Sequence, residues 1–428
     1  MKYNEALQYM YDALPMFHRQ GQSAFKKDLT NIRLLCAALG NPHLKLKCIH
    51  IAGTNGKGSV SHMLASVLQA NGYRTGLYVS PHYKDFRERI KIDGECIPKR
   101  IVSAFIENNR DLFARVQPSF FEMTVALAFY WFARQQVDYA VIETGLGGRL
   151  DSTNIVMPML SIITNISWDH KDMLGDSLEK IAFAKAGIIK QDTPVLIGRR
   201  QKETQAVFAT QAKELSAPLS YADEWMDELE SKTDNLGIAN IRIKIHGRHY
   251  KLKPALKGWY QLENIRTVMA ALLLMEDRKQ LKLTLKRNLY ALEHVDQLSR
   301  IVGRWQALSQ HPMVIAESAH NEDGIRFMVE QLKHTAYEQL HIVCGFVKDK
   351  PLDPVLGLLP KSAQYYFVKA DMPRGLDAET LCRQAAAFDL HGQAYASVRK
   401  GLKAARQTAT KTDLILVTGS IFVVGEIL

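Results

Sequence analysis

Residues 53–59, which read GTNGKGS, have the composition of a phosphate-binding loop. Glycines let a backbone curl so that several N–H groups face one anion, and the helix that follows adds its positive N-terminal end. Lys57 can reach the outer phosphates, and Ser59 can offer its hydroxyl to a phosphate or to Mg²⁺. Gly58 separates this lysine from this serine, which departs from the standard spacing. Because a predicted strand precedes the loop and an amphipathic helix follows it, the pattern predicts nucleotide binding.

Three further ionisable residues could take part in the chemistry: Glu143 and His170 follow predicted strands, and Lys185 lies in a predicted helix. Glu143 ends the apolar segment 138–142, and a carboxylate at the end of a parallel strand beside a phosphate loop can hold a divalent cation bound to ATP. His170 follows another strand and becomes a candidate metal ligand if that strand ends at the same edge. Taken singly, Glu143 is more often an edge residue or a salt-bridge partner, His170 is usually a structural residue, and Lys185 is usually a solvated helix lysine.

These residues are positioned by alternating strand and helix patterns, which are typical of a parallel sheet. The expected strands are 47–52, 75–79, 138–142, 160–164 and 194–197, and the expected helices follow residue 59 and cover 122–135 and 177–187. The charged, alternating segment 220–255 favours antiparallel strands on the edge of this first domain. A helix is expected over 262–275.

Near residue 303 the alternation restarts. Strands are expected over 313–316, 341–344, 365–368 and 413–418, with a helix over 324–332. The sequence therefore predicts an α/β protein with two domains. Residues 1–298 are expected to form a P-loop, parallel-sheet ATPase domain, and residues 299–428 are expected to form a smaller Rossmann-like α/β domain.

Composition narrows the class of protein. Hydrophobic residues make up 47% and charged residues 23% of the 428 residues, the balance of a globular protein. The longest apolar stretch, residues 120–133, contains Glu122 and is shorter than the ~20 residues that span a bilayer. The start of the chain lacks a signal-peptide pattern, and five scattered cysteines indicate a reducing compartment. We therefore expect a cytoplasmic protein with no membrane partner.

The formal net charge of +11 favours anionic partners such as nucleotides and polycarboxylates. No long run of Lys and Arg and no nucleic-acid motif occurs, so no nucleic-acid partner is expected.

A series of short motifs resembles those of one family, the folylpolyglutamate synthases and dihydrofolate synthases of the Mur ligase superfamily. The motifs are HIAGTNGKGSV (50–60), SPH (80–82), FRERI (86–90), FEMT (121–124), ETGLGGRLDSTN (143–154), WDHKDMLG (168–175), KAGIIK (185–190), GRWQ (303–306), AHN (319–321) and TGS (418–420). They lie in the family's order over nearly the whole chain.

The resemblance implies an ATP-dependent carboxylate–amine ligase that adds L-glutamate to dihydropteroate, to a folyl-(poly)glutamate or to both, through an acyl phosphate. It implies Mg²⁺ held by residues matching Ser80, Glu143 and His170, and it also allows a monovalent cation such as K⁺. The lysine matching Lys185 is typically carboxylated on Nζ by CO₂.

The resemblance also implies roles for other positions. ATP would be contacted by Asn55, Gly56, Lys57, Gly58, Ser59, Asn264, Arg304 and Glu317. Lys57 and Lys185 would take part in catalysis, and His320 is a candidate base or orienting group for the amine. Thr124 and Asn154 fall in stretches that line the pterin pocket of two-activity members. We expect a monomer.

The chain departs from the family pattern in three places. The usual Asp-Gly-Ala-His-Asn reads Glu-Ser-Ala-His-Asn at 317–321, so the acid is one methylene longer. The usual Gly-x-His-Gln reads Gly-Trp-Tyr-Gln at 258–261. Residues 24–30, AFKKDLT, lack the clearest pteroate-loop pattern, which leaves the choice of acceptor open.

Three other classes compete with this interpretation. A ligase that joins amino acids to a cell-wall nucleotide shares the chemistry, but Gly58 and the 143–154 motif favour the folate branch. A P-loop kinase or regulatory NTP-binding module would form ADP without consuming glutamate. A basic RNA-binding protein would bind RNA tightly, with a strong dependence on salt.

Overall fold

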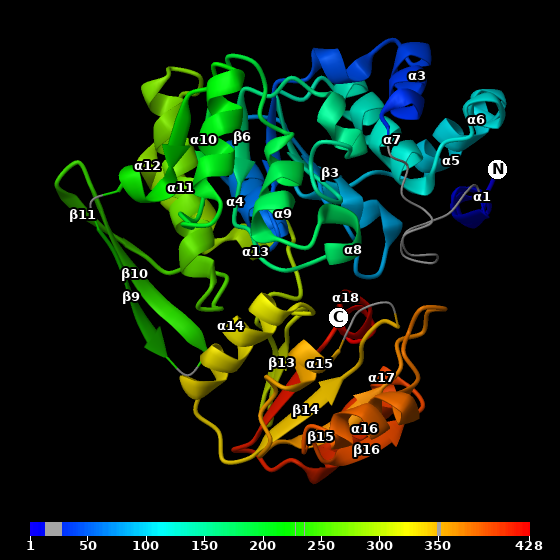
Figure 1. Cartoon of the computed structure of the whole chain (residues 1–428), viewed down its shortest axis with the longest axis vertical. Coiled ribbons are helices and arrows are strands. Elements are labelled where there is room, and N and C mark those ends of the chain that lie inside the picture. Colours follow the sequence, from blue (N-terminus) through cyan, green and yellow to red (C-terminus); the bar gives the residue numbers. More distant parts are fainter. Residues whose placement is uncertain (13–27, 227, 235, 349–351) are drawn as a thin grey trace.

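The computed structural model describes residues 1–12, 28–226, 228–234, 236–348 and 352–428. These residues form three β-sheets with helices packed around them. In Figure 1 most elements up to α13 (Val295–Leu298) fill the upper part of the molecule and those from β12 (Gln306–Gln310) onward fill the lower part, with the C-terminus close to the boundary between them. The strands β9 (Glu228–Asp234) and β10 (Gly237–Ile245) extend downward on the left to the level of α14 (Glu322–Lys333).

The largest sheet has eight strands in the order β4-β3-β2-β5-β1-β6-β7-β8. Pairing is parallel from β2 to β8, whereas β3 and β4 are added antiparallel at one edge. The strands are β1 (Cys48–Ala52), β2 (Thr75–Tyr78), β3 (Ile90–Ile92), β4 (Glu95–Cys96), β5 (Tyr139–Glu143), β6 (Leu160–Ile163), β7 (Val195–Ile197) and β8 (Leu219–Tyr221). The five strands predicted for this sheet are confirmed to within one or two residues, while β3, β4 and β8 were not predicted.

Helices of this upper part cover both faces of the sheet. They are α1 (Tyr3–Asp12), α3 (Thr30–Ala38), α4 (Lys57–Ala70), α5 (Lys99–Asn108), α6 (Arg110–Val116), α7 (Phe120–Arg134), α8 (Lys171–Leu174), α9 (Leu178–Ala186), α10 (Gln205–Glu214), α11 (Gln261–Asp277), α12 (Leu285–Glu293) and α13 (Val295–Leu298), with short 3₁₀ turns η2 (Pro42–Lys45), η3 (Phe86–Arg89), η4 (Ser152–Ile155) and η5 (Ala222–Glu224).

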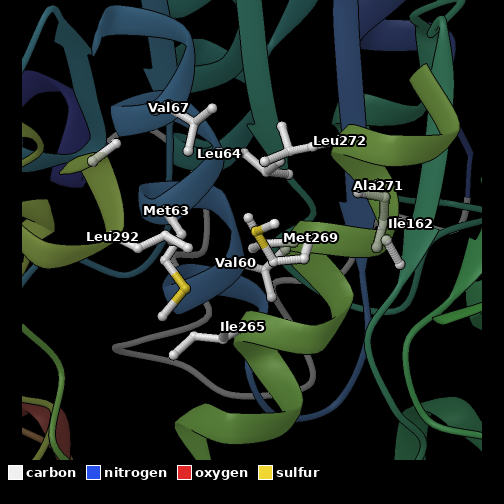
Figure 2. Packing of buried hydrophobic residues seen from close by; sticks show 14 of the residues in the cluster. Val60, Met63, Leu64, Val67, Ile162, Ile265, Met269, Ala271, Leu272 and Leu292 are labelled. Carbon is white, nitrogen blue, oxygen red and sulfur yellow. The ribbon is translucent and has the colours of Figure 1, made fainter. Parts of the chain in front are cut away.

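Helix α4, which follows the glycine-rich loop, packs its apolar stripe against α11 and α12 (Figure 2). Val60, Leu64 and Val67 recur at helical spacing and are fully buried, as are Ile265 and other residues of α11. The loop is therefore fixed to a rigid core directly behind it.

Helix α7 begins two residues earlier than the sequence suggested. Ser119 is its N-cap: the Ser119 hydroxyl accepts a hydrogen bond from the backbone of Glu122, and the Glu122 carboxylate accepts one from the Ser119 N–H. Glu122 is thus the third residue of the helix, where it completes a capping box, and not the first residue as the sequence suggested.

The segment predicted to be antiparallel forms a separate three-stranded sheet of β9 (Glu228–Asp234), β10 (Gly237–Ile245) and β11 (Arg248–Leu252). The antiparallel pairing is confirmed. Alternate residues of β10, Ile241 and Ile243, are buried in the same core as α4 and α11.

The lower part contains a six-stranded sheet in the order β12-β13-β17-β14-β15-β16, parallel except for β12. Its strands are β12 (Gln306–Gln310), β13 (Met313–Ala316), β14 (Leu340–Cys344), β15 (Gln364–Val368), β16 (Gly392–Tyr395) and β17 (Leu414–Thr418), and its helices are α14 (Glu322–Lys333), α15 (Asp353–Leu356), α16 (Ala378–Ala386), α17 (Val398–Thr408) and α18 (Ile421–Gly425). The four predicted strands and the helix at 324–332 are confirmed, and the edge strands β12 and β16 were not predicted. Within the described residues, no helix has the length and apolar character that crossing a membrane requires.

The packing in Figure 2 predicts a large cost for truncating Leu64. Leu64→Ala removes a side chain with 0% exposure from the α4 core and should lower the free energy of unfolding by about 3 kcal/mol. Urea unfolding followed by circular dichroism measures it. Leu34→Ala, at a helical leucine that is 50% exposed, is the matched control and should cost less than about 1 kcal/mol. Equal costs would contradict the packing.

Candidate functional site

Strand register brings the chemically active residues to one edge of the large sheet. Ile51 of β1 pairs with Glu143 of β5, and Ala52 pairs with Ile163 of β6. Because parallel strands all end at the same edge, the loop after β1, the Glu143 carboxylate and the segment after β6 converge there.

These groups line a cleft of about 210 Å³ between the upper and lower parts of the molecule. Its lining includes the following residues that the sequence singled out: Asn55, Gly56, Lys57, Gly58, Ser59, Ser80, Glu143, His170, Lys185, Asn264, Arg304, Glu317 and His320. The structure therefore assembles the predicted nucleotide-binding, metal-binding and catalytic residues in one place.

The glycine-rich loop is held by residues that follow β6. The Asn165 carbonyl accepts a hydrogen bond from Thr54 N at 2.9 Å, and its side-chain oxygen accepts one from Asn55 N at 3.0 Å. The Thr164 hydroxyl donates to the Asn55 carbonyl at 2.6 Å. Gly56 is the N-cap of α4 with φ of 84°, a conformation that favours glycine. The helix end and its unpaired N–H groups thus point toward the cleft.

Two lysines approach this loop from different elements. Lys57 Nζ donates to the carbonyls of Gly53 and Thr54 at 3.0 and 3.1 Å. Lys185 of α9 donates from Nζ to the same Gly53 carbonyl at 2.8 Å and is buried. Burial, followed by the charge of Lys57, lowers the pKa of Lys185 to about 7. Lys185 therefore has a substantial neutral fraction near pH 7, which its position on a predicted surface helix did not suggest.

Glu143 is the buried acid of the cleft. It is 3% exposed, and its Oε2 accepts a hydrogen bond from the backbone of Ser80 at 3.1 Å. Burial raises the pKa of Glu143 to about 7, although Lys57 and the Ser80 N–H act to lower it. A cation at this carboxylate would favour its ionised form.

The side chains at the cleft suit a magnesium ion that is coordinated partly by the protein and partly by the phosphates of a nucleotide. Among the described residues, no group of three or more His, Cys, Asp or Glu could hold a metal ion by itself. Ser80, Glu143 and His170 nevertheless line the same cleft. Mg²⁺ usually takes one or two carboxylates and completes its shell with water and phosphate oxygens. The site therefore suits a nucleotide-bound ion better than an independent metal centre.

A short polar chain links the start of α11 to the glycine-rich loop. Asn264 donates to the Gln261 side chain at 2.8 Å, and Gln261 donates to the Ser59 hydroxyl at 3.3 Å. Asn264 also lies directly against Gly56, where a Cβ would clash with the Asn264 Oδ1. Asn264 is thus positioned beside the loop, as predicted.

Arg304 reaches the cleft from the segment before β12. Its Nη1 donates to the Tyr83 hydroxyl at 2.8 Å and to the Ser318 hydroxyl. Its Nη2 lies 3.6 Å from the Cβ that a side chain at Gly58 would have. Glu317 is buried at the end of β13 and accepts hydrogen bonds from neighbouring groups. The lower part therefore contributes one cation and one acid to the cleft.

Asp169 lies between two histidines. Its Oδ2 is 3.7 Å from His170 Nε2 and 3.8 Å from His320 Nε2. His320 Nδ1 lies 3.0 Å from the Ser318 carbonyl, which can only accept, so Nδ1 carries the proton. In neutral His320 the basic Nε2 therefore faces Asp169 and the cleft.

The predicted substrate residues Thr124 and Asn154 are not part of the cleft lining. Thr124 is 0% exposed within α7, and its hydroxyl donates to the Phe120 carbonyl at 2.7 Å. The Asn154 side chain is buried and donates to the carbonyls of Arg149 and Gly187. The Thr124 hydroxyl and the Asn154 amide nitrogen thus make structural hydrogen bonds, whereas the buried Asn154 Oδ1 has no hydrogen-bond partner. Of the 24–30 loop, residues 24–27 lie outside the described residues.

Several residues that line the cleft or contact its lining were not singled out as site residues by the sequence. Tyr83 and Tyr260 contact Arg304 and Glu317 respectively, and Asn165 anchors the loop. Asp323 of α14 accepts hydrogen bonds from Asn55 at 3.3 Å and from Ser167 at 2.7 Å. Tyr83 directly follows the predicted SPH motif, the one local signal that could have drawn attention to it.

Comparison with known families places the whole described cleft within two Mur ligase modules. Residues 51–272 match the Mur ligase middle domain, and residues 303–421 match the Mur ligase glutamate ligase domain. The first match alone covers more than half of the chain.

Individual relatives point to the same family as the two matched domains. The dihydrofolate synthase/folylpolyglutamate synthase of Bacillus subtilis is 30% identical, over 97% of this chain and 97% of that protein. A probable bifunctional folylpolyglutamate synthase/dihydropteroate synthase of Haloferax volcanii is 32% identical over 100% of this chain, which spans only 50% of that longer protein.

Solved structures have the same architecture. Escherichia coli FolC, in complex with DHPP and ADP, has a TM-score of 0.84 at 26% identity, covering 100% of this chain and 97% of that chain. A bifunctional folylpolyglutamate synthase/dihydrofolate synthase with Mn, AMPPNP and L-glutamate bound has a TM-score of 0.83 at 26% identity, with 100% and 97% coverage.

The geometry at Gly56 predicts a specific loss of nucleotide binding. Gly56→Ala would place a Cβ against Asn264 Oδ1 and should weaken binding of AMPPNP by at least about tenfold, measured by calorimetry. Gly72→Ala is the control, because Gly72 has a similar φ of +93° but no atom lies within 4 Å of the place where its Cβ would be. AMPPNP affinity should change less than about twofold in the control. Unchanged affinity in Gly56→Ala would exclude the loop as the nucleotide site.

Proposed function

The chain belongs to the folylpolyglutamate synthase/dihydrofolate synthase family of the Mur ligase superfamily, and on this basis we propose that it is an ATP-dependent ligase. It joins the amine of L-glutamate to a carboxylate of dihydropteroate, of a folyl-(poly)glutamate or of both. The observation that carries the proposal is the convergence of Lys57, Glu143 and Arg304 in one cleft formed by both modules.

In the first step a carboxylate oxygen of the acceptor attacks the γ-phosphorus of ATP. The bond from that phosphorus to the β–γ bridging oxygen breaks, ADP leaves, and an acyl phosphate forms. Asn55, Gly56, Gly58 and Ser59 supply the loop that binds the phosphates. Lys57 and Arg304 neutralise the charge that spreads over the transferring phosphoryl group. Asn264 and Glu317 contact the remainder of the nucleotide.

In the second step the α-amine of glutamate attacks the activated carbonyl. The carbon–nitrogen bond forms as inorganic phosphate leaves, and the nitrogen loses a proton. His320 accepts that proton or orients the amine, because its basic Nε2 faces the cleft. A bare carboxylate would be too poor an electrophile for this attack, which is why the phosphoryl transfer must come first.

Magnesium is the cofactor that the residues suit. Ser80, Glu143 and His170 would hold it, and it would supply positive charge at the phosphate oxygens. A monovalent cation such as K⁺ belongs to the same proposal.

Carboxylation of Lys185 by CO₂ is part of the proposal. A lysine must lose its proton before its nitrogen can attack CO₂, and Lys185 is a buried amine with a pKa lowered to about 7. The product would be a carbamate, which carries a negative charge at the metal side of the loop.

The two functional units are residues 1–298 and 299–428, which is supported by the separation of the eight-stranded and six-stranded sheets. The monomeric state and the cytoplasmic location stay predictions.

The function is tested by incubating the protein with ATP, Mg²⁺, labelled glutamate and either dihydropteroate or tetrahydrofolate, with products identified by mass. We expect one amide bond per ADP formed at steady state, and no more than about one ADP per enzyme molecule without glutamate, because the acyl phosphate then has no amine to react with. A UDP-linked cell-wall precursor as sole acceptor should give no product. Sustained ADP formation that is independent of glutamate, or a stable phosphorylated product, would indicate a kinase or an NTPase instead.

Lys57→Ala should slow the glutamate-dependent turnover at saturating ATP by at least about 10²-fold, since it removes a preorganised charge. Lys213→Ala, at an exposed lysine of α10, is the control and should have no effect. Both turnover rates are measured as ADP release. Near-normal turnover in Lys57→Ala would remove this lysine from the mechanism.

A carbamate at Lys185 predicts chemical rescue. Lys185→Ala should lose most activity and regain part of it when acetate or formate is added, because a free carboxylate can occupy the position of the carbamate. Lys190→Ala is the matched control: Lys190 is partly buried, with a pKa lowered to about 8, but its Nζ donates to the Asn154 carbonyl outside the cleft. Its activity should not respond to added carboxylate. Absence of rescue in Lys185→Ala would contradict the carbamate.

A further inference from the structure

We propose that Tyr260 is a positioning residue for phosphoryl transfer: it fixes Glu317, and through Glu317 the backbone that directs the Arg304 guanidinium at the glycine-rich loop. This inference rests on the proposed function and adds a residue outside the set of sites already described.

The contact joins the two modules. Tyr260 is the N-cap of α11 in the upper part, and its hydroxyl donates to Glu317 Oε2 at 2.6 Å. The same carboxylate oxygen accepts a hydrogen bond from the backbone N–H of Trp305 at 2.9 Å. Glu317 is 4% exposed and Trp305 is 3% exposed, so neither hydrogen bond is readily replaced by water. Tyr260, Arg304 and Glu317 all line the cleft.

The sequence departs from the family pattern at both ends of this hydrogen bond. By the resemblance described in the sequence analysis, Tyr260 stands where the family motif is expected to have histidine, and Glu317 where it is expected to have the shorter aspartate. Each of the two side chains is longer than the one it replaces, and the structure brings their ends into contact across 57 residues of sequence. The contact between Tyr260 and Glu317 therefore becomes evident only from the structure, and neither residue suggests it alone.

Glu317 controls Arg304 through the adjacent residue. Trp305 has φ of 48°, a left-handed conformation that costs free energy in a bulky residue and needs support from its surroundings. The Trp305 N–H to Glu317 hydrogen bond provides that support and sets where the preceding Arg304 side chain begins. The far end of Arg304 is held by Tyr83 at 2.8 Å and by Ser318. The Arg304 side chain is thus restrained both at its backbone and at its guanidinium, which faces Gly58.

Loss of the Tyr260 hydroxyl leaves a buried carboxylate short of one donor. Arg304 is the cation whose charge acts on Glu317, and a shift of the guanidinium toward Glu317 takes it away from the loop. Because Arg304 acts on charge that develops during phosphoryl transfer, the loss appears in kcat more than in the KM for ATP.

Tyr260→Phe tests this directly, with glutamate-dependent ADP formation as the assay. We expect kcat to fall about tenfold and the KM for ATP to change less than about threefold. Tyr365→Phe is the matched control, because its hydroxyl also donates at 2.6 Å, to the Pro360 carbonyl, but lies in the C-terminal module outside the cleft lining. The control should keep kcat within about twofold. Melting temperatures of both variants report any general loss of stability.

Combining the change with Arg304→Lys tests the route of the effect. If Tyr260 acts through the Arg304 guanidinium, Tyr260→Phe should reduce kcat by less than about twofold in the Arg304→Lys background. The same tenfold loss in both backgrounds, an equal loss in Tyr365→Phe, or a rise in the KM for ATP with unchanged kcat would each overturn the proposal. If the wild type forms ADP in a glutamate-dependent reaction and Tyr260→Phe has the same kcat, only the role of Tyr260 is overturned. If the wild type forms no ADP in response to glutamate, the proposed function is overturned and the role of Tyr260 with it.

Discussion

The parallel register of β2, β5, β1 and β6 is the constraint on which the site depends. It aligns the ends of strands that are widely separated in sequence, so that Gly53, Glu143 and Thr164 meet at one edge. Side chains alternate between the two faces of a strand, so a slip of one residue would turn Glu143 away from the loop. Parallel strands must be joined by long crossover connections, and these connections contain the helices that bury the sheet on both faces.

The second constraint is electrostatic. The cleft buries cations and acids close to one another. Burial raises the pKa of Glu143 and lowers that of Lys185, each to about 7, so both are held near the point of losing their charge. Burial disfavours the charged form of both groups despite the hydrogen bonds that they make. An anionic triphosphate with its cation would add opposite charges beside them, so nucleotide binding and the stability of this region are thermodynamically linked.

The sequence was informative where function is encoded locally. The loop at 53–59 and the strand that ends at Glu143 carry their signals in adjacent residues, and parallel topology then predicted that they meet. The edge strand Gly392–Tyr395 escaped notice because it is short and partly exposed, without the apolar run that marked its buried neighbours. Thr124 was placed at a ligand by motif alone, whereas the structure shows its hydroxyl bonded within its own helix. The Tyr83 and Tyr260 contacts depend on distances between modules, which no local pattern contains.

The contacts that join the two modules at the loop are polar. Asn55 donates to Asp323 and accepts a hydrogen bond from Asn321, and Ser167 also donates to Asp323. Polar groups of this kind can exchange their partners for water at a small net cost, unlike the apolar cores behind them. The two modules therefore meet at the loop through contacts that cost less to separate than the apolar cores behind them. Because Asn55 belongs to the loop itself, whatever occupies the loop acts directly on the hydrogen bonds that hold the second module in place.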